Sequence, residues 1–302
     1  MFGKADDMTS RLVLGTANYG RLSQAEVDKL LGTALELGID KLDTAHRYED
    51  SEKKIGVSLR LNQGFTINTK ACPYGPEFFT PTGIRFSIEE SLRRLGVESI
   101  GTLFTHSIPP KFLTNENIET MILLKKEGKI ERIGFSGDNS DLTYAIDIGT
   151  FDDFQVTMNI IDQANLDQVR RVPETSNVYY KLSMAQAIWT CLEWKNRVKS
   201  NKRIREILKK LPVSDSWADY RARFNRLLPE LNQDDFPSLF LRFALFSGSK
   251  NQYVILGSSS PEHIREAANV ELDRLNPQVL SISKYEDLFV RLSFPEWSAH
   301  EG

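Results

Sequence analysis

The chain has 302 residues, 40% of them hydrophobic, and a formal net charge of −3. A chain of this length can bury a large core, and it suits either two ordinary domains or one α/β barrel. The near-neutral charge, with Lys and Arg scattered among acids, argues against a nucleic-acid-binding surface. The basic run at 195–210 is better explained as the solvated face of an amphipathic helix, because Ile204, Ile207 and Leu208 recur at helical spacing.

The cysteines and histidines limit the chemistry further. Cys72 and Cys191 are the only cysteines and form no CxxC pair, which favours a reducing compartment over a disulfide framework. The histidines show no metal-ligand spacing. No uncharged apolar stretch approaches the ~20 residues of a membrane span, and the first ten residues contain no apolar signal core. We therefore expect a cytoplasmic protein that has no metal site and binds neither nucleic acid nor a membrane.

Short β-like runs alternate with segments of helical period from Arg11 onward, as in βα units around a parallel sheet. The first unit is a strand at 11–16, then a helix that opens with a capping box at Ser23 and Glu26 and ends at Gly38. Further helices are predicted before Gly96, before Gly128, at 141–148 and from Pro261. The later predicted strands are 39–43, 65–69, 100–104, 130–136, 154–158, 178–182 and 253–256. This order predicts an α/β fold, a (β/α)8 TIM barrel, formed by a single domain over 1–302.

One segment interrupts the alternation. Between Trp189 and Phe236 the chain is long, charged and aromatic, and it shows no strand pattern. Loops of this length without secondary structure are uncommon inside compact domains. We therefore predict a helical insertion at about 190–236, after the seventh strand, rather than a second domain.

Polar side chains follow three consecutive predicted strands at the end where the loops of a barrel form its active site. Asp43 and Tyr48 follow the second strand, Lys70 the third and His106 the fourth. A phenol is a weak acid at neutral pH, and a neighbouring ammonium makes it more acidic. A carboxylate keeps that ammonium charged and oriented, and a neutral imidazole can donate to a substrate oxygen. Each residue alone has an ordinary structural explanation, but together they predict a proton-transfer site with Tyr48 as general acid.

A sequence motif at this site resembles a known family. The run Asp43-Thr44-Ala45-His46-Arg47-Tyr48-Glu49-Asp50-Ser51-Glu52 resembles the Asp-Thr-Ala-x-x-Tyr-Gly-x-Ser-Glu signature of aldo-keto reductases. The resemblance runs from Arg11 to about Asn269, and later blocks follow in the family's order at Lys70, His106, Gly128–Ser136 and Gly257–His263. It implies a TIM barrel, bound NADP(H) or NAD(H) without a Rossmann domain, and a catalytic tetrad of Asp43, Tyr48, Lys70 and His106. The implied activity is reduction of an aldehyde, ketone or sugar-like carbonyl, or the reverse oxidation.

The resemblance also implies contacts to the cofactor. Ser136 and Gln155 would hold the nicotinamide carboxamide, and Asn139 would take an amide role because the usual Asn after this Ser is Gly137 here. Tyr180 would stack on the nicotinamide ring. The full set of implied contacts is Gly15, Thr16, Asp43, Ser136, Asn139, Gln155, Tyr180, Gly257, Ser258, Ser259, His263, Arg265 and Glu266.

The block after the last strand bears on the choice of nucleotide. Strict NADPH members of the family usually carry a Lys and an Arg there, at positions that match Gly257 and His263. Two fixed positive charges that would bind the ribose phosphate of NADPH are therefore absent, and Arg265 can replace them only in part. We therefore expect weak discrimination between NADPH and NADH.

Two other functions stay open on the sequence. The departures at Glu49 and Gly137 leave room for a regulatory subunit that binds nicotinamide nucleotide with little turnover. Lys70 can also be imagined as the Schiff-base amine of a cofactor-free isomerase or lyase, which borohydride trapping would reveal. The substrate, the reaction direction and the oligomeric state do not follow from the sequence, because specificity depends on the shape of loops.

Overall fold

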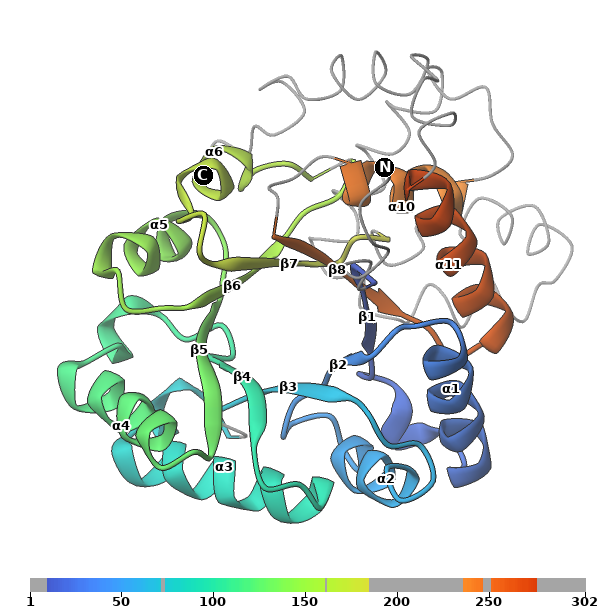
Figure 1. Cartoon of the computed structure of the whole chain (residues 1–302). Helices are drawn as coiled ribbons and strands as arrows, with labels where there is room; N and C mark the ends of the chain where they lie inside the picture. The colour runs from blue at the N-terminus through green and yellow to red at the C-terminus, as the bar shows by residue number, and fades with distance from the viewer. Residues whose placement is uncertain (1–9, 72–73, 161, 185–235, 247–250, 276–302) are drawn as a thin grey trace, which may run out of the picture.

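A closed barrel of parallel strands forms the centre of the molecule (Figure 1). The structure is a computed structural model that describes residues 10–71, 74–160, 162–184, 236–246 and 251–275. Within these ranges eight strands pair in chain order, and the last pairs with the first. The strands are β1 (Leu12–Gly15), β2 (Lys41–Asp43), β3 (Thr66–Lys70), β4 (Ile100–Phe104), β5 (Ile130–Ser136), β6 (Asp153–Thr157), β7 (Asn177–Lys181) and β8 (Gln252–Gly257). The predicted (β/α)8 barrel is confirmed.

Helices follow the strands and cover the outside of the barrel. They are α1 (Gln24–Glu36), α2 (Ser51–Ser58), α3 (Pro81–Leu95), α4 (Asn115–Lys126), α5 (Asn139–Ile148), α6 (Leu166–Arg171), α10 (Phe236–Phe246) and α11 (Pro261–Leu275), with short 3-10 turns at Tyr19–Arg21, Pro76–Phe78 and Pro110–Phe112. The predicted capping box is present at the start of α1, where Ser23 and Glu26 exchange hydrogen bonds. Gly38 and Gly96 take the left-handed conformation expected after a helix, with φ of 76° and 67°.

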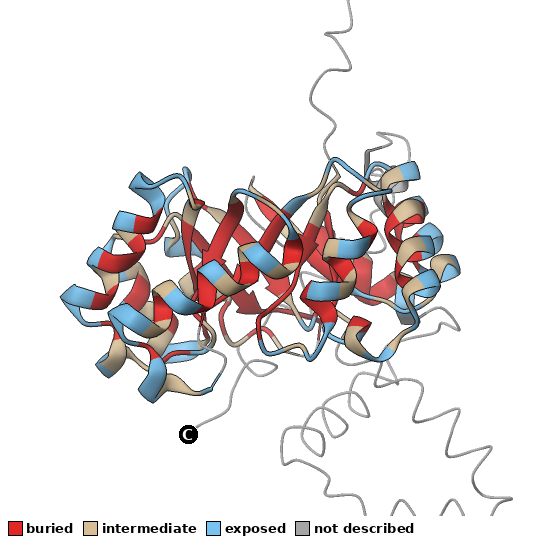
Figure 2. Cartoon of the chain, turned by 90° about the horizontal axis from the view of Figure 1, so that it is seen from below, coloured by how far each residue is buried: buried red, intermediate tan, exposed pale blue. Residues whose placement is uncertain are grey.

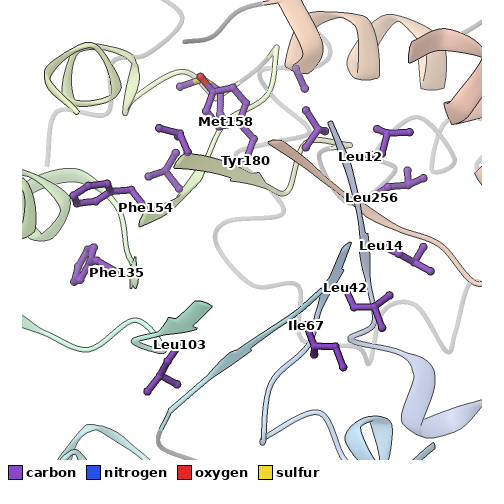
Figure 3. Packing of buried hydrophobic residues seen from close by; sticks show 14 of the residues in the cluster. Leu12, Leu14, Leu42, Ile67, Leu103, Phe135, Phe154, Met158, Tyr180 and Leu256 are labelled. Atoms are coloured by element: carbon purple, nitrogen blue, oxygen red, sulfur yellow. The ribbon is translucent and has the colours of Figure 1, made fainter. Parts of the chain in front are cut away.

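The core has two layers because successive side chains on a strand face opposite sides. A small inner cluster consists of Val13, Phe104, Tyr179 and Ile255. A larger cluster joins the outer face of the strands to the helices, and Leu12 and Leu14 belong to it (Figure 3). Figure 2 shows that the strands are buried and that the exposed residues lie along the outer faces of the helices.

Polar side chains tie together the N-terminal ends of the strands. Asp153, which is fully buried, accepts hydrogen bonds from Thr102 at 2.6 Å, from Arg132 at 2.7 Å and from the Asn177 side chain at 2.9 Å. These four residues lie on four neighbouring strands, β4 to β7. The network therefore holds the strands together at the end opposite the loops that follow them.

Part of the prediction lies outside the described residues. The insertion expected at about 190–236 falls there, except for Phe236, which begins α10. Among the residues that are described, no helix is long and apolar enough to cross a membrane, and no group of His, Cys, Asp and Glu is arranged to hold a metal ion.

Candidate active site

The predicted carboxylate and ammonium meet at the C-terminal ends of two paired strands. Asp43 is the last residue of β2 and Lys70 the last of β3. Lys70 Nζ donates to Asp43 Oδ2 at 2.7 Å and to the carbonyl of Thr44 at 2.8 Å. Their side chains are only 4% and 7% exposed, Lys70 first, so this is a buried ion pair. Such a pair needs further hydrogen bonds to offset the loss of water.

The phenol and the imidazole complete the group. Tyr48, half-buried on the loop between β2 and α2, has Lys70 Nζ 5.1 Å from its ring centroid. The His106 ring meets Tyr48 edge to face, with ring centroids 6.0 Å apart and an interplanar angle of 85°. The fold therefore brings the four side chains of the predicted tetrad together.

Charges and burial set the protonation of two members of this group. Burial lowers the pKa of Lys70, but the charge of Asp43 and the neighbouring Tyr48 raise it more, so the net shift is above the ordinary value. Burial, and then the positive charges of Lys70, Arg47 and Lys181, lower the pKa of His106 to about 3. At neutral pH the site therefore contains an ammonium and a neutral imidazole. The part played by Arg47 and Lys181 is not predicted from the sequence, although one precedes Tyr48 and the other ends β7.

The backbone next to two of these side chains is unusual. Glu49, directly after Tyr48, has φ of 49°, and Ser107, directly after His106, has φ of 55°. Residues other than glycine rarely adopt this conformation, and functional sites often contain such strain. The aldo-keto reductase signature has Gly at the position of Glu49. The backbone of Glu49 nevertheless has the positive φ that glycine favours. The Glu49 side chain instead forms an exposed ion pair with Arg21 at 3.0 Å.

Gly15 and Thr16, predicted to contact the cofactor, lie against Asp43. Thr16 donates both its backbone N–H and its hydroxyl to the Asp43 carbonyl, each at 3.0 Å. A Cβ added at Gly15 would lie 2.9 Å from the Ile255 side chain. Thr16 therefore helps to hold the end of β2, whereas Gly15 allows close packing of β1 against the Ile255 side chain of β8.

Ser136 and Gln155, which are predicted to hold the nicotinamide carboxamide, lie side by side on β5 and β6. The Ser136 hydroxyl donates to Gln155 Oε1 at 2.9 Å, and Gln155 Nε2 donates to Asp43 Oδ1 at 2.7 Å. Asn139 is exposed at the start of α5, with its backbone N–H bonded to Asn165 at 2.7 Å. A Cβ at Gly137 would lie 2.5 Å from the Phe135 ring, so an Asn at that position would require this buried ring to move.

The residues predicted to bind the nucleotide phosphates lie where β8 joins α11. Gly257, Ser259, His263, Arg265 and Glu266 are exposed, and Ser258 is half-buried. The Ser258 hydroxyl donates to the Ser260 carbonyl at 3.0 Å. This loop follows a strand, so it lies at the same end of the barrel as the tetrad. Exposed hydroxyls beside the N-terminus of a helix suit a phosphate group.

Tyr180 is the exception, because its side chain points away from the site although it lies near the C-terminal end of β7. Its side chain is fully buried in the outer cluster, between the barrel and its helices (Figure 3). Its neighbour Tyr179 faces the barrel interior instead. Strand alternation therefore turns Tyr180 away from the tetrad, and we correct its assignment as the residue that stacks on the nicotinamide.

The fold and the tetrad define the class of protein: a TIM barrel with a buried Asp–Lys ion pair beside a tyrosine and a histidine at the C-terminal ends of its strands. The model of the Aldo/keto reductase family matches residues 11–284. The chain therefore belongs to the aldo/keto reductase family and is an NAD(P)H-dependent oxidoreductase. The family that the sequence motif implies is confirmed.

Relatives and solved structures agree with this membership. The chain is 25% identical to the NADH-specific methylglyoxal reductase of Escherichia coli (strain K12), over 89% of this chain and 93% of the relative. It is 32% identical to the L-galactose dehydrogenase of Arabidopsis thaliana over 43% of this chain and 44% of the relative. An aldo-keto reductase from Bacillus halodurans in its holo form has the same fold, with a TM-score of 0.74, 20% identity and coverage of 97% of this chain and 94% of that one.

Proposed function

We propose that the chain reduces an aldehyde, ketone or sugar-like carbonyl, with Tyr48 as the general acid. The observation that carries the proposal is that the Tyr48 ring lies close to both the Lys70 ammonium, 5.1 Å from its centroid, and the His106 imidazole, 6.0 Å from it. A phenol beside an ammonium donates its proton more readily, because the positive charge stabilises the phenolate left behind.

Each of the four side chains has one part in this proposal. Hydride for the carbonyl carbon would come from a nicotinamide nucleotide held beside the tetrad. Tyr48 donates a proton to the carbonyl oxygen, and Lys70 stabilises the phenolate. Asp43 keeps Lys70 charged and oriented through the 2.7 Å bond. His106 has a pKa of about 3, so at neutral pH its imidazole is neutral and can donate a hydrogen bond to the substrate oxygen.

The residues beside the tetrad fit a nicotinamide nucleotide. The Ser136 hydroxyl and the Gln155 amide lie on β5 and β6 next to Asp43, which suits the carboxamide of the nicotinamide. The exposed loop Gly257–Ser259 and the start of α11 suit its phosphates. His263 and Arg265 are the candidate partners of the ribose phosphate of NADPH. Because the Lys and Arg that strict NADPH members usually carry are absent, we propose that both NADPH and NADH are used.

The two alternatives differ in what they require of this site. A Schiff-base lyase needs an unprotonated Lys70, whereas the ion pair with Asp43 raises the pKa of Lys70 and keeps it protonated. A regulatory subunit has no need for four converging proton-transfer groups. The tetrad therefore favours turnover.

The test combines binding with turnover. Quenching of tryptophan fluorescence during titration with NADPH and with NADH measures nucleotide binding. Oxidation of each nucleotide is then followed with a panel of small aldehydes, ketones and sugars, and methylglyoxal belongs in it because an Escherichia coli relative is named for reducing it. We expect binding together with turnover of at least one carbonyl. Binding without turnover across the panel would support the regulatory subunit instead.

A further inference from the structure

A chain of hydrogen bonds crosses the barrel from β5 to β2 through the side chain of Gln155. The Ser136 hydroxyl donates to Gln155 Oε1 at 2.9 Å, and Gln155 Nε2 donates to Asp43 Oδ1 at 2.7 Å. All three residues are buried, with 2%, 1% and 5% exposure in the order Ser136, Gln155, Asp43. Gln155 and Asp43 are 112 residues apart in the sequence, so only the closed barrel brings them together.

The hydrogen-bonding requirements of the groups fix the direction of this chain. A carboxylate can only accept, so the Asp43 oxygen must face the amide nitrogen of Gln155. The amide oxygen then points to the Ser136 hydroxyl, which donates to it. Lys70 occupies the other Asp43 oxygen at 2.7 Å. Both carboxylate oxygens are therefore satisfied in a buried setting, as a stable buried charge requires.

We propose that Gln155 is a positioning residue for proton transfer, which holds Asp43 against Lys70 and so keeps the Lys70 ammonium directed at Tyr48. This role is separate from any contact of Gln155 with a nicotinamide carboxamide. It rests on the proposed function only in taking Tyr48 as the general acid.

The charges around Tyr48 give the sign of the effect. Lys70, Arg47 and Lys181 contribute positive charge near the Tyr48–His106 pair, and His106 is neutral. The negative groups nearby are Asp43, Glu49, which follows Tyr48 in the chain and pairs with Arg21, and Asp138, which pairs with Lys181 at 3.0 Å. The positive end of the Gln155 amide dipole offsets part of the Asp43 charge. Without that donor, Asp43 opposes the Lys70 ammonium more strongly, and the phenolate form of Tyr48 becomes harder to reach.

The test follows the ionisation of Tyr48 in the full chain without added nucleotide, so that carboxamide binding has no influence. The protein carries tyrosine labelled with ¹³C at Cζ, and the Tyr48 resonance is assigned from its absence in Tyr48→Phe. In Gln155→Met we expect the midpoint of the Tyr48 titration to rise by about 0.5 pH unit or more. In Gln155→Glu, which adds a second carboxylate beside Asp43, it should rise further.

Gln252→Met is the matched control, because Gln252 is also a buried glutamine on a barrel strand but begins β8 at the opposite end and donates to the Ala244 carbonyl. Its Tyr48 midpoint should equal that of the wild type. Thermal melts identify variants that do not fold, and Ser136→Ala, which frees the Gln155 amide to reorient, tests the same chain with a smaller change. Its midpoint should also rise.

Unchanged midpoints in folded Gln155→Met, Gln155→Glu and Ser136→Ala would overturn the proposal, even if their nucleotide affinity fell. Failure of the proposed function is a different result: Tyr48→Phe would keep carbonyl turnover whatever the Gln155 variants do to the phenol.

Discussion

Replacing Lys70 by Met distinguishes the contribution of the buried Asp43–Lys70 ion pair to stability from its contribution to turnover. The change removes the ammonium but leaves the Asp43 carboxylate buried, with Gln155 as its remaining side-chain donor. Removing one partner of a buried pair costs about 3–5 kcal/mol. Because Gln155 still donates to Asp43, we expect the free energy of unfolding to fall by about 3 kcal/mol. Turnover should fall by roughly 10²-fold or more, the scale of a lost general acid, since the proposed mechanism needs the Lys70 ammonium beside Tyr48 during proton transfer.

Two double variants complete this experiment. Urea unfolding measures the stability of Lys70→Met, and single-turnover kinetics measure its chemistry. Adding Asp43→Asn removes the unpaired charge, so the double variant should recover much of the stability but none of the turnover. Adding Tyr48→Phe to Lys70→Met should reduce turnover little further, because Lys70 acts through Tyr48. Wild-type turnover in Lys70→Met, or losses that multiply fully in the second double variant, would refute the reasoning.

Three further predictions concern nucleotide choice, acid stability and the far end of the barrel. NADPH and NADH affinities should differ only weakly, because the positions that carry a Lys and an Arg in strict NADPH members of the family are Gly257 and His263 here; a large preference for NADPH in calorimetry would point to Arg265. Burial lowers the pKa of His46 to about 4 and that of His106 to about 3, so protonation of either imidazole favours the unfolded chain. Unfolding experiments should therefore show a stability that is present above about pH 6.5 and is lost toward pH 4, on the order of 3 kcal/mol per residue. Replacing both residues by Gln should flatten this pH profile. Asp153→Ala should cost about 1–3 kcal/mol in urea unfolding because it removes the buried acceptor of Thr102 and Asn177, while Arg132, 35% exposed, can still reach water. It should spare turnover in the molecules that remain folded.

The strands and the tetrad are predictable because their signals are local. A βα alternation and polar residues at consecutive strand ends are visible without knowledge of the fold. Helix α2 is absent from the predictions for a physical reason: the residues it buries are Ser51, Glu52, Ile55 and Ser58, so its inner face is mostly polar and gives no apolar period. Glu52 is held there by Thr69 at 2.8 Å, a contact that spacing along the chain does not reveal.

The side to which a residue points is harder to predict than its strand. An error of one residue in the predicted end of a strand does not change where its side chains point. Choosing the wrong one of two neighbouring residues does matter, because their side chains lie on opposite faces of the strand. Tyr180 was assigned to the cofactor because it is an aromatic residue near the end of β7, yet it faces the helices. The Gln155–Asp43 bond depends on barrel closure, which is not encoded in any single segment.

The central claim is that Tyr48 gives its proton to a carbonyl, and Tyr48→Phe tests it most directly. The variant keeps the ring that lies beside His106 and loses only the hydroxyl. We predict that carbonyl reduction falls by roughly 10²-fold or more, while the dissociation constants for NADPH and NADH stay nearly unchanged. Retained turnover would remove Tyr48 from the mechanism and contradict the account.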